Sequence, residues 1–260
     1  MPATDPRSRP GPRPALGQRL AILAALATVA SGLVAGVVSA RPETAELATP
    51  GPGRELTVVE LFTSQGCSAC PPANANLVTL APRPDVLALS FNVTYWDQLG
   101  WKDTFAQDDF TRRQRDYQRG LGTDNVWTPQ VVVDGRSHVV GQRLSEIERL
   151  VSGHRRFTGP TLRFNAGGAV GLAGGAPPAA PADVWLVRYE LRPIEVPVAR
   201  GENGGRTLPH AAVVRDLVRL GPWDGTTAGY RFPAASRPGL GTAILVQEAG
   251  GGPVLAAARN

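Results

Sequence analysis

Cysteine is scarce in this chain of 260 residues, which contains only Cys67 and Cys70. A bridge between residues three apart closes a very small loop, so it constrains the unfolded chain little. A fold that depends on disulfides needs more cysteines at longer separations. The scarcity excludes a disulfide-rich scaffold and leaves three interpretations of the pair: a redox centre, metal ligands, or a local clip.

Histidine is also scarce, and its spacing does not suit a structural metal site. The three histidines are His138, His154 and His210. Structural zinc usually takes four Cys or His ligands, and the sequence has neither a second Cys-x-x-Cys pair nor a His-x3-His pair. A copper(I) site with two thiolates stays open, because soft thiolates select that ion. The Gly-x-Ser-x-Gly elbow of many serine hydrolases is missing too.

A basic run is missing from the body of the chain, although the formal net charge is +5. The first forty residues carry Arg7, Arg9, Arg13 and Arg19 against Asp5, so removing them leaves +5 − 3 = +2. A protein that binds nucleic acid needs a clustered basic surface. We therefore expect no nucleic-acid partner.

Long apolar runs are confined to the N-terminal region. The run LAILAALATVASGLVAGVVSA ends at Ala40 in small residues that a signal peptidase reads. It is longer than a usual signal core, so a retained membrane anchor is the alternative to a cleaved signal peptide. Either form of residues 1–40 predicts an exported protein, periplasmic or secreted, that touches the membrane only through this segment. Residues 41–54 are polar and rich in Pro and Gly, which indicates a linker.

Residues 55–156 alternate between strand and helix signals. The β-branched run Glu55–Thr63 predicts a buried strand, and Pro71–Ala81 predicts a helix with proline in its first turn. A second apolar strand is expected at Asp85–Val93. The remaining expected elements are a helix at 108–122, a hairpin of 128–135 and 137–141 that turns at Asp-Gly, and a helix at 144–153. This order predicts an α/β domain.

Residues 157–260 have a different texture, with short β-like runs between Gly and Pro clusters. We expect a smaller, mostly β, sandwich-like domain there. Segment 210–220 fits both a strand and a helix period, and its β surroundings favour a strand. The glycine-rich GENGGR, Gly201–Arg206, is typical of a tight turn.

The cysteine pair is expected where the first strand turns into the first helix. Only a thiolate attacks a disulfide, and a helix N-terminus favours the thiolate through its free N–H groups and positive dipole end. Cys67, at the helix tip, is expected to be exposed and to attack. Cys70, one turn further in, is expected to be shielded and to resolve the mixed disulfide.

A strand, a Cys-x-x-Cys pair that opens a helix and a later Thr-Pro before a strand together resemble the thioredoxin superfamily. The resemblance implies an α/β thioredoxin-like fold and a cis proline against the cysteine pair, which in this chain is Pro129. It also implies that Glu60, in the strand before the cysteines, takes the proton from the resolving thiol. The alternative for Glu60 is an acid at the end of the strand that pairs with an arginine or faces water.

The blocks ELFTSQGCSACPPA, YWDQLGWKD, RQRDYQRGLG, TPQVVVDGR and GENGGRTL resemble an exported bacterial family catalogued as domain of unknown function 1223. The resemblance covers residue 56 to the C-terminus and implies a thioredoxin-like fold without an assigned activity. It also raises an alternative for 201–206, a loop of the second domain that lies over the first.

These observations predict an extracytoplasmic thiol-disulfide oxidoreductase that uses Cys67 and Cys70. Its expected partners are protein or small-molecule thiols and disulfides, and no organic cofactor is expected. The alternative is a non-enzymatic binding protein of the cell envelope, in which the cysteine pair is a static disulfide or a copper(I) ligand.

Overall fold

The strand that precedes the cysteines, β1 (Thr57–Thr63), is buried along its whole length. The computed structural model describes residues 56–260. In it β1 pairs in parallel with β2 (Val86–Asn92) and antiparallel with β3 (Gln130–Val133), which in turn pairs with β4 (Ser137–Val139). The sheet order is therefore β2-β1-β3-β4. The edge strand β2 is buried along its whole length, as β1 is. A strand buried on both faces carries a continuous apolar run, which is why the sequence predicts both strands well.

The three expected helices are confirmed, each ending within two residues of its predicted end. They are α1 (Pro71–Leu80), α2 (Asp108–Gly120) and α3 (Leu144–Ser152), and a short 3-10 helix, η1 (Asp97–Leu99), precedes α2. Prolines occupy the first turn of α1, where a missing N–H costs no hydrogen bond. Helix α1 therefore begins directly after Cys70.

The predicted Asp-Gly hairpin turn between β3 and β4 is also confirmed. Asp134 and Gly135 both adopt positive φ, 51° and 63°. Two consecutive left-handed residues are what a two-residue hairpin turn requires, and Asp-Gly supplies them at low cost.

Nine strands follow α3, and they form three further sheets. The four-stranded sheet has the order β10-β7-β12-β13, the three-stranded sheet has the order β11-β6-β5, and β8 and β9 form a hairpin of their own. Segment 210–220 lies mainly in a strand, as its surroundings predict. The bounds are β5 (Thr161–Asn165), β6 (Ala169–Ala173), β7 (Ala182–Glu190), β8 (Ile194–Val198), β9 (Arg206–His210), β10 (Val214–Trp223), β11 (Ala228–Arg231), β12 (Leu240–Glu248) and β13 (Val254–Arg259).

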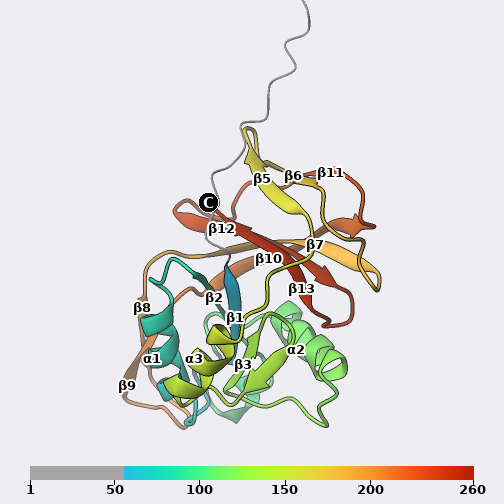
Figure 1. Ribbon diagram of the computed structural model, residues 1–260. Coiled ribbons are helices and arrows are strands. Elements are labelled where there is room, and N and C mark those ends of the chain that lie inside the picture. The colour runs from blue at the N-terminus through green and yellow to red at the C-terminus, as the bar shows by residue number, and fades with distance from the viewer. Residues whose placement is uncertain (1–55) are drawn as a thin grey trace, which may run out of the picture. The chain divides into compact units, whose positions relative to one another are not determined.

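The expected fold class, an α/β thioredoxin-like domain followed by a smaller mostly-β domain, is wrong. The described residues form thirteen strands in several sheets and only three α-helices, so the protein is mostly β. The reason is that the helices are short, whereas the C-terminal runs become strands of up to ten residues that pair with one another. In Figure 1 most of these strands occupy the middle and top of the view above the three helices, while β8 and β9 lie beside α1 at the lower left.

One buried cluster joins the two halves of the chain. Val58 of β1 and Leu77 of α1 belong to the same core as Val187 of β7 and Leu245 of β12. Burying side chains of this size stabilises the folded state by about 1.5–3 kcal/mol each. The domain boundary expected at 156–157 stays a prediction. If the two halves separated into independent domains, the contacts of this shared core would be lost.

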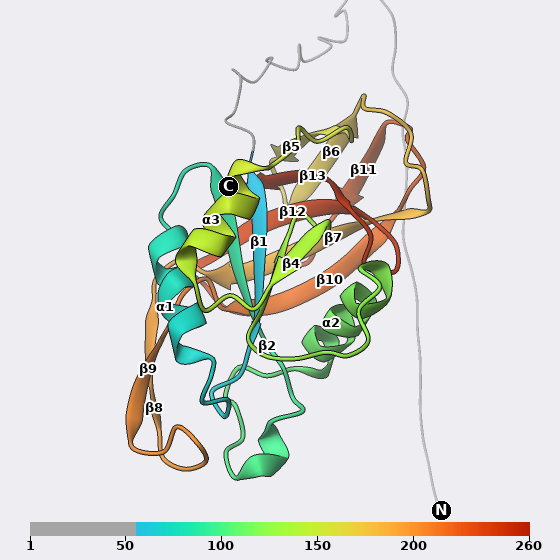
Figure 2. The ribbon, with the colours of Figure 1, turned by 60° about the horizontal axis from the view of Figure 1, so that its bottom comes forward.

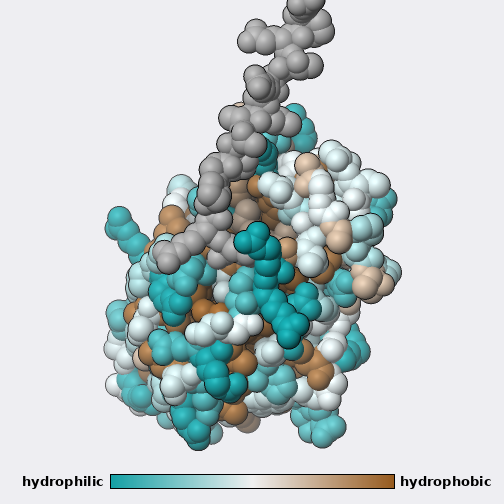
Figure 3. Space-filling model, in the orientation of Figure 1, coloured by the Kyte–Doolittle hydropathy of each residue, from teal (hydrophilic) through white to brown (hydrophobic). Residues whose placement is uncertain are grey.

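The N-terminal segment expected as signal peptide or anchor, residues 1–40, and the linker at 41–54 lie outside the described residues. Within 56–260, none of the helices combines the length and the apolar character needed to cross a bilayer. On the face seen in Figure 3, hydrophobic residues form patches between hydrophilic ones.

Candidate functional site

Both cysteines lie in the connection from β1 to α1, as predicted. After β1 the chain turns, with the Cys67 N–H donating to the Ser64 carbonyl over 3.2 Å. The Cys70 N–H then donates to the Cys67 carbonyl over 3.1 Å, and Cys70 occupies the N-cap position of α1. The two thiols therefore stand on consecutive turns at the N-terminal end of a helix.

The expected exposure of Cys67 is wrong, because Cys67 and Cys70 are both 0% exposed. Only the two residues between them, Ser68 and Ala69, are open to solvent. Both cysteines are free thiols. Helix geometry predicts an open sulfur at the tip of α1, whereas the tertiary structure buries it.

The two thiols have opposite pKa shifts. A hydrogen bond from the Cys70 side chain is the main cause that lowers the pKa of Cys67 to about 7, against the opposing effect of burial. Backbone N–H groups of Ala69 and Cys70 lower it further. Burial is the main cause that raises the pKa of Cys70 above that of a free thiol, and the neighbouring Cys67 adds to it. Near neutral pH Cys67 is therefore partly ionised, whereas Cys70 keeps its proton.

The peptide bond between Thr128 and Pro129 is cis, as the resemblance implies. The Cys67 thiol donates to the Thr128 carbonyl over 3.7 Å, so the segment before Pro129 lies directly against the first cysteine. Pro129 itself is buried. Residues 61 positions apart in the sequence thus meet at one sulfur.

Gln114 of α2 holds this proline segment in place, a role that the sequence interpretation missed. Its side-chain amide, which is fully buried, donates to the Trp127 carbonyl over 2.7 Å and to Gln130 Oε1 over 2.9 Å. The Tyr95 hydroxyl donates to Gln114 Oε1 over 3.2 Å. The available signal was a polar side chain on the otherwise apolar stripe of the helix that includes Phe110 and Tyr117.

Tyr95 connects this network to the cysteines. Burial is the main cause that raises the pKa of its hydroxyl, and the charges of Cys70 and Cys67 raise it further. With its pKa raised in this way, the Tyr95 hydroxyl stays protonated at neutral pH.

Glu60 is fully buried in β1, and its carboxylate is bound by α2. The Arg113 Nε atom donates to Glu60 Oε1 over 2.7 Å, and the Tyr117 hydroxyl donates to the other carboxylate oxygen. Arg113 also donates to Gln247 of β12 over 3.0 Å. None of the hydrogen bonds among residues 56–260 joins Glu60 to a cysteine. Its role as proton acceptor stays a prediction, while the ion pair ties β1, α2 and β12 together.

Asp103 anchors the segment that leads into the cysteines. Its carboxylate accepts the Gln65 N–H over 2.7 Å, the Asn92 amide over 2.8 Å and the Phe105 N–H over 2.8 Å. Burial raises the pKa of Asp103, opposed by these donors. The Trp101 indole N–H donates to Gln65 Oε1 over 2.9 Å, so the loop after η1 also binds the side chain of Gln65.

The glycine-rich segment 201–206 forms the tip of the β8–β9 hairpin and reaches the cysteine loop. The Asn203 side-chain amide donates to the carbonyls of Gln65 and Cys67, each over 2.9 Å. The Ser68 N–H donates to Glu202 Oε2 over 3.0 Å. Hydrogen bonds from the side chain of Ser68 and then from its backbone lower the pKa of that carboxyl. Both expectations for the segment hold: it is a tight turn, and it lies over the first half of the chain.

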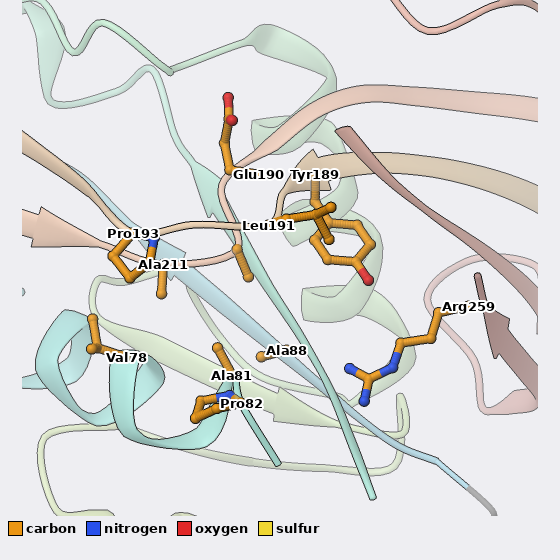
Figure 4. A pocket seen from close by; sticks show the side chains of 11 residues that line it. Val78, Ala81, Pro82, Ala88, Tyr189, Glu190, Leu191, Pro193, Ala211 and Arg259 are labelled. Atoms are coloured by element: carbon orange, nitrogen blue, oxygen red, sulfur yellow. The ribbon is translucent and has the colours of Figure 1, made fainter. Parts of the chain in front are cut away.

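A separate cavity of about 230 Å3 lies away from the cysteines. Its walls include Val78 and Ala81 at the C-terminal end of α1, about 15 Å along a ten-residue helix from the N-terminal end. Figure 4 shows mainly aliphatic side chains around it, with Tyr189, Glu190 and Arg259 as polar members. The Arg259 guanidinium is occupied by the carbonyls of Val86, Arg83 and Pro84.

Among the described residues, no group of three or more His, Cys, Asp and Glu side chains is arranged to hold a metal ion. His138 packs against Trp127, and His154 pairs with Asp134. His210 packs against Phe105, and burial lowers the pKa of its imidazole to about 4. The three histidines therefore have neighbours other than the thiols.

Comparison with known proteins gives a family and a fold. The family model described as "Protein of unknown function (DUF1223)" matches residues 58–247. The crystal structure of protein AGR_C_4864 from Agrobacterium tumefaciens is 33% identical, with a TM-score of 0.65, over 79% of this chain and 94% of that one. HBP35 of Porphyromonas gingivalis is 13% identical with a TM-score of 0.54, over 81% and 76% of the two chains, a likeness of fold alone. No curated protein matches the chain.

Proposed function

Because the chain belongs to the DUF1223 family of proteins of unknown function, we propose its activity from the cysteine site itself: thiol-disulfide exchange through Cys67 and Cys70. The observation that carries the proposal is the hydrogen-bonded pair of free thiols at the start of α1, with a lowered pKa on one and a raised pKa on the other. A cysteine pair with only a structural role does not require its two thiols to have opposite pKa shifts. The partners are protein or small-molecule disulfides and thiols, and the exchange uses no organic cofactor.

The chemistry begins at Cys67, whose thiolate is the nucleophile. It attacks one sulfur of a partner disulfide, R–S–S–R′, and forms Cys67–S–S–R while R′–S⁻ leaves and takes up a proton. Cys70 then loses its proton and attacks the Cys67 sulfur, which releases R–S⁻. The partner gains two electrons and the protein gains a Cys67–Cys70 disulfide. A second thiol pair outside the protein restores the two thiols by the reverse exchange, and the relative potentials set the direction.

The surroundings of the pair suit each step. At neutral pH a thiol with a pKa near 7 is partly ionised and still a good nucleophile. The raised pKa of Cys70 keeps it protonated until the mixed disulfide forms. The Thr128 carbonyl, fixed by the cis bond to Pro129, accepts the Cys67 thiol hydrogen and orients that side chain. The proposal rests on this local arrangement, since the mostly β architecture does not support the thioredoxin fold class.

We place this exchange outside the cytoplasm. The N-terminal sequence motif ending at Ala40 supports export, and disulfides persist in the periplasm and outside the cell. Fractionation of cells that produce the full chain tests the placement, with N-terminal sequencing of the mature protein as the readout. A mature N-terminus at Arg41 supports a cleaved signal, and an intact chain in the membrane fraction supports an anchor.

Two serine variants test the exchange itself, and each is the matched control for the other. In Cys70→Ser the attack by Cys67 still occurs but resolution is lost, so a mixed disulfide with a model peptide disulfide accumulates. In Cys67→Ser the nucleophile is missing, and no adduct forms. Intact-mass spectrometry after incubation with the peptide measures both, and catalysed reduction of insulin in the presence of dithiothreitol measures turnover by the wild type. Equal adduct formation in the two variants would contradict the proposal.

The complete burial of both cysteines favours a second candidate, a binding protein of the cell envelope whose cysteine pair is static. In that case wild type and Cys67→Ser show the same negligible rate of insulin reduction. Copper analysis of protein purified without chelator, with Cys67→Ser as control, tests whether the pair holds copper(I). One copper per wild-type chain that is lost in the variant would support that version.

A further inference from the structure

The β8–β9 hairpin is separate from the other sheets of residues 56–260, since its two strands pair only with each other. Figure 2 shows the hairpin alongside α1, with the turn that joins β8 to β9 at the bottom of the view. Its two strands, which form the base of the hairpin beside the tip, are fixed by apolar packing, because Val196, Val198 and Leu208 are buried. Its tip differs: Arg200, Gly201 and the glycines 204 and 205 are exposed. Tip and base are thus held by different kinds of interaction.

Polar contacts hold the tip against the cysteine loop. Asn203 is 0% exposed, and its Nδ2 atom donates to the carbonyls on both sides of Gly66, those of Gln65 and Cys67. Its Oδ1 atom accepts from Arg206 over 2.7 Å, so every polar atom of that side chain is used. Glu202 adds the hydrogen bond from the Ser68 N–H.

The glycines of the tip allow this close approach. Gly201 has φ of 77°, and a Cβ atom there would lie 3.2 Å from Cβ of Trp101. Gly205 has φ of 80° and returns the chain to β9. The tip therefore approaches the loop at 99–101 closely at Gly201, where a side chain would crowd Trp101.

We propose that the hairpin tip is a cover over Cys67, held shut by Asn203 and Glu202, that opens to let a partner reach the thiol. Opening breaks the three hydrogen bonds to the cysteine loop and leaves the apolar base of the hairpin in place. Local openings of this kind draw on few contacts and need no global unfolding. The biological meaning of the cover rests on the proposed exchange, whereas its existence can be measured without any exchange.

The test is the alkylation rate of Cys67 in the reduced full chain, with iodoacetamide as probe and mass spectrometry to assign the modified cysteine. If the site reacts only when open, the rate is the product of the open fraction and the reactivity of a free thiolate. Asn203→Ala is expected to raise the rate roughly tenfold or more, as loss of buried hydrogen bonds shifts the opening equilibrium. Glu202→Gln is expected to raise it by a smaller factor.

Matched variants separate opening from general effects of the substitutions. Asn165→Ala, at the exposed end of β5, and Glu195→Gln, on the exposed side of β8, repeat the chemical changes away from the tip contacts. Both are expected to keep the wild-type rate. The rate is measured against pH, because opening raises the plateau at high pH whereas a changed charge near Cys67 moves the midpoint. Glu202→Gln also serves if Asn203→Ala fails to fold.

Three outcomes would overturn the cover: wild-type Cys67 reacting as fast as a free thiol of the same pKa, tip variants matching their controls, or a shift of midpoint without a change in plateau. Failure of the proposed exchange looks different. In that case alkylation rises in the tip variants as expected, yet no mixed disulfide accumulates in Cys70→Ser. That result would show that the hairpin tip covers Cys67 in a protein that does not exchange disulfides, and it would support the candidate with a static cysteine pair.

Discussion

The side-chain amide of Asn203 lies 2.9 Å from the backbone oxygen of Cys67, although 136 residues separate the two along the chain. The contact joins the C-terminal half of the protein to the loop that carries both cysteines. Cys67 itself is 0% exposed, although a thiol at a helix tip is by itself open to solvent. The properties of the cysteine pair are therefore shared between local sequence and distant segments.

The pKa of Cys67 is expected to depend on the side chain at position 70. The hydrogen bond from Cys70 is the largest cause of the lowered pKa, so Cys70→Ala is expected to raise it above about 7. Cys70→Ser keeps a donor and is expected to raise it less. Thiolate is then lost at a higher pH in Cys70→Ala, because an acid with a higher pKa is protonated earlier as the pH falls. Alkylation rate against pH measures all three midpoints, and identical midpoints would contradict the assigned cause.

The Glu60–Arg113 ion pair is expected to stabilise the folded state strongly, because removing one partner leaves a buried charge. Arg113→Met is expected to cost about 3–5 kcal/mol of unfolding free energy. Arg112→Met, at the exposed neighbouring position, is expected to cost no more than about 1 kcal/mol. Urea unfolding measures both. If both variants lost the same unfolding free energy, the buried ion pair would stabilise the protein no more than an exposed one.

Glu60→Gln then separates the structural role of this carboxylate from the proton-transfer role. If the ion pair is its main role, the combined loss in Glu60→Gln/Arg113→Met is smaller than the sum of the single losses. Disulfide exchange by the folded Glu60→Gln variant then keeps the wild-type rate. A variant that folds normally but resolves mixed disulfides slowly would instead support the catalytic prediction.

Gln114 is expected to position the segment before Pro129. Gln114→Ala removes two donors to that segment and is expected to cost about 1–3 kcal/mol of unfolding free energy. Gln118→Ala, one turn later, loses only an exposed hydrogen bond to the Asp124 carbonyl and is the matched control. Because the Thr128 carbonyl accepts the Cys67 thiol, Gln114→Ala is also expected to shift the pH midpoint of Cys67 alkylation. A purely structural residue would leave that midpoint unchanged.

The turn between β12 and β13 is expected to pack tightly on α2. A Cβ atom at Gly251 would lie 2.2 Å from the Asp116 carbonyl oxygen, whereas one at Gly250 meets nothing within 4 Å. Both glycines have positive φ, 78° and 71°, so both alanine variants cost about 1–2 kcal/mol from the backbone. Gly251→Ala is expected to cost at least about 2 kcal/mol more, through displacement of the turn. Equal melting temperatures for the two variants would refute the close packing.

Local patterns predicted the first half of the chain well. Continuous apolar runs indicated β1 and β2, prolines after Cys70 indicated the start of α1, and Asp134-Gly135 indicated the hairpin turn. These signals depend on neighbours within a few residues, so they predict the same helices, strands and turns in any fold that buries the same side chains. The same patterns led to a wrong fold class, because short runs between glycines give no measure of how long the strands become once they pair.

The amino-acid sequence by itself determined that two thiols stand one turn apart at the start of a helix, because that placement needs only a strand, a turn and two prolines. It also determined that Pro129 is able to adopt a cis bond, since proline permits one at low cost. Only the tertiary structure decided that Thr128 accepts the Cys67 thiol, that Arg113 takes the carboxylate of Glu60, and that Asn203 lies on the cysteine loop. Each of these contacts joins residues more than fifty positions apart. A polar group that the fold buries costs free energy unless it finds a partner, and which distant partner is within reach is something that no local pattern records.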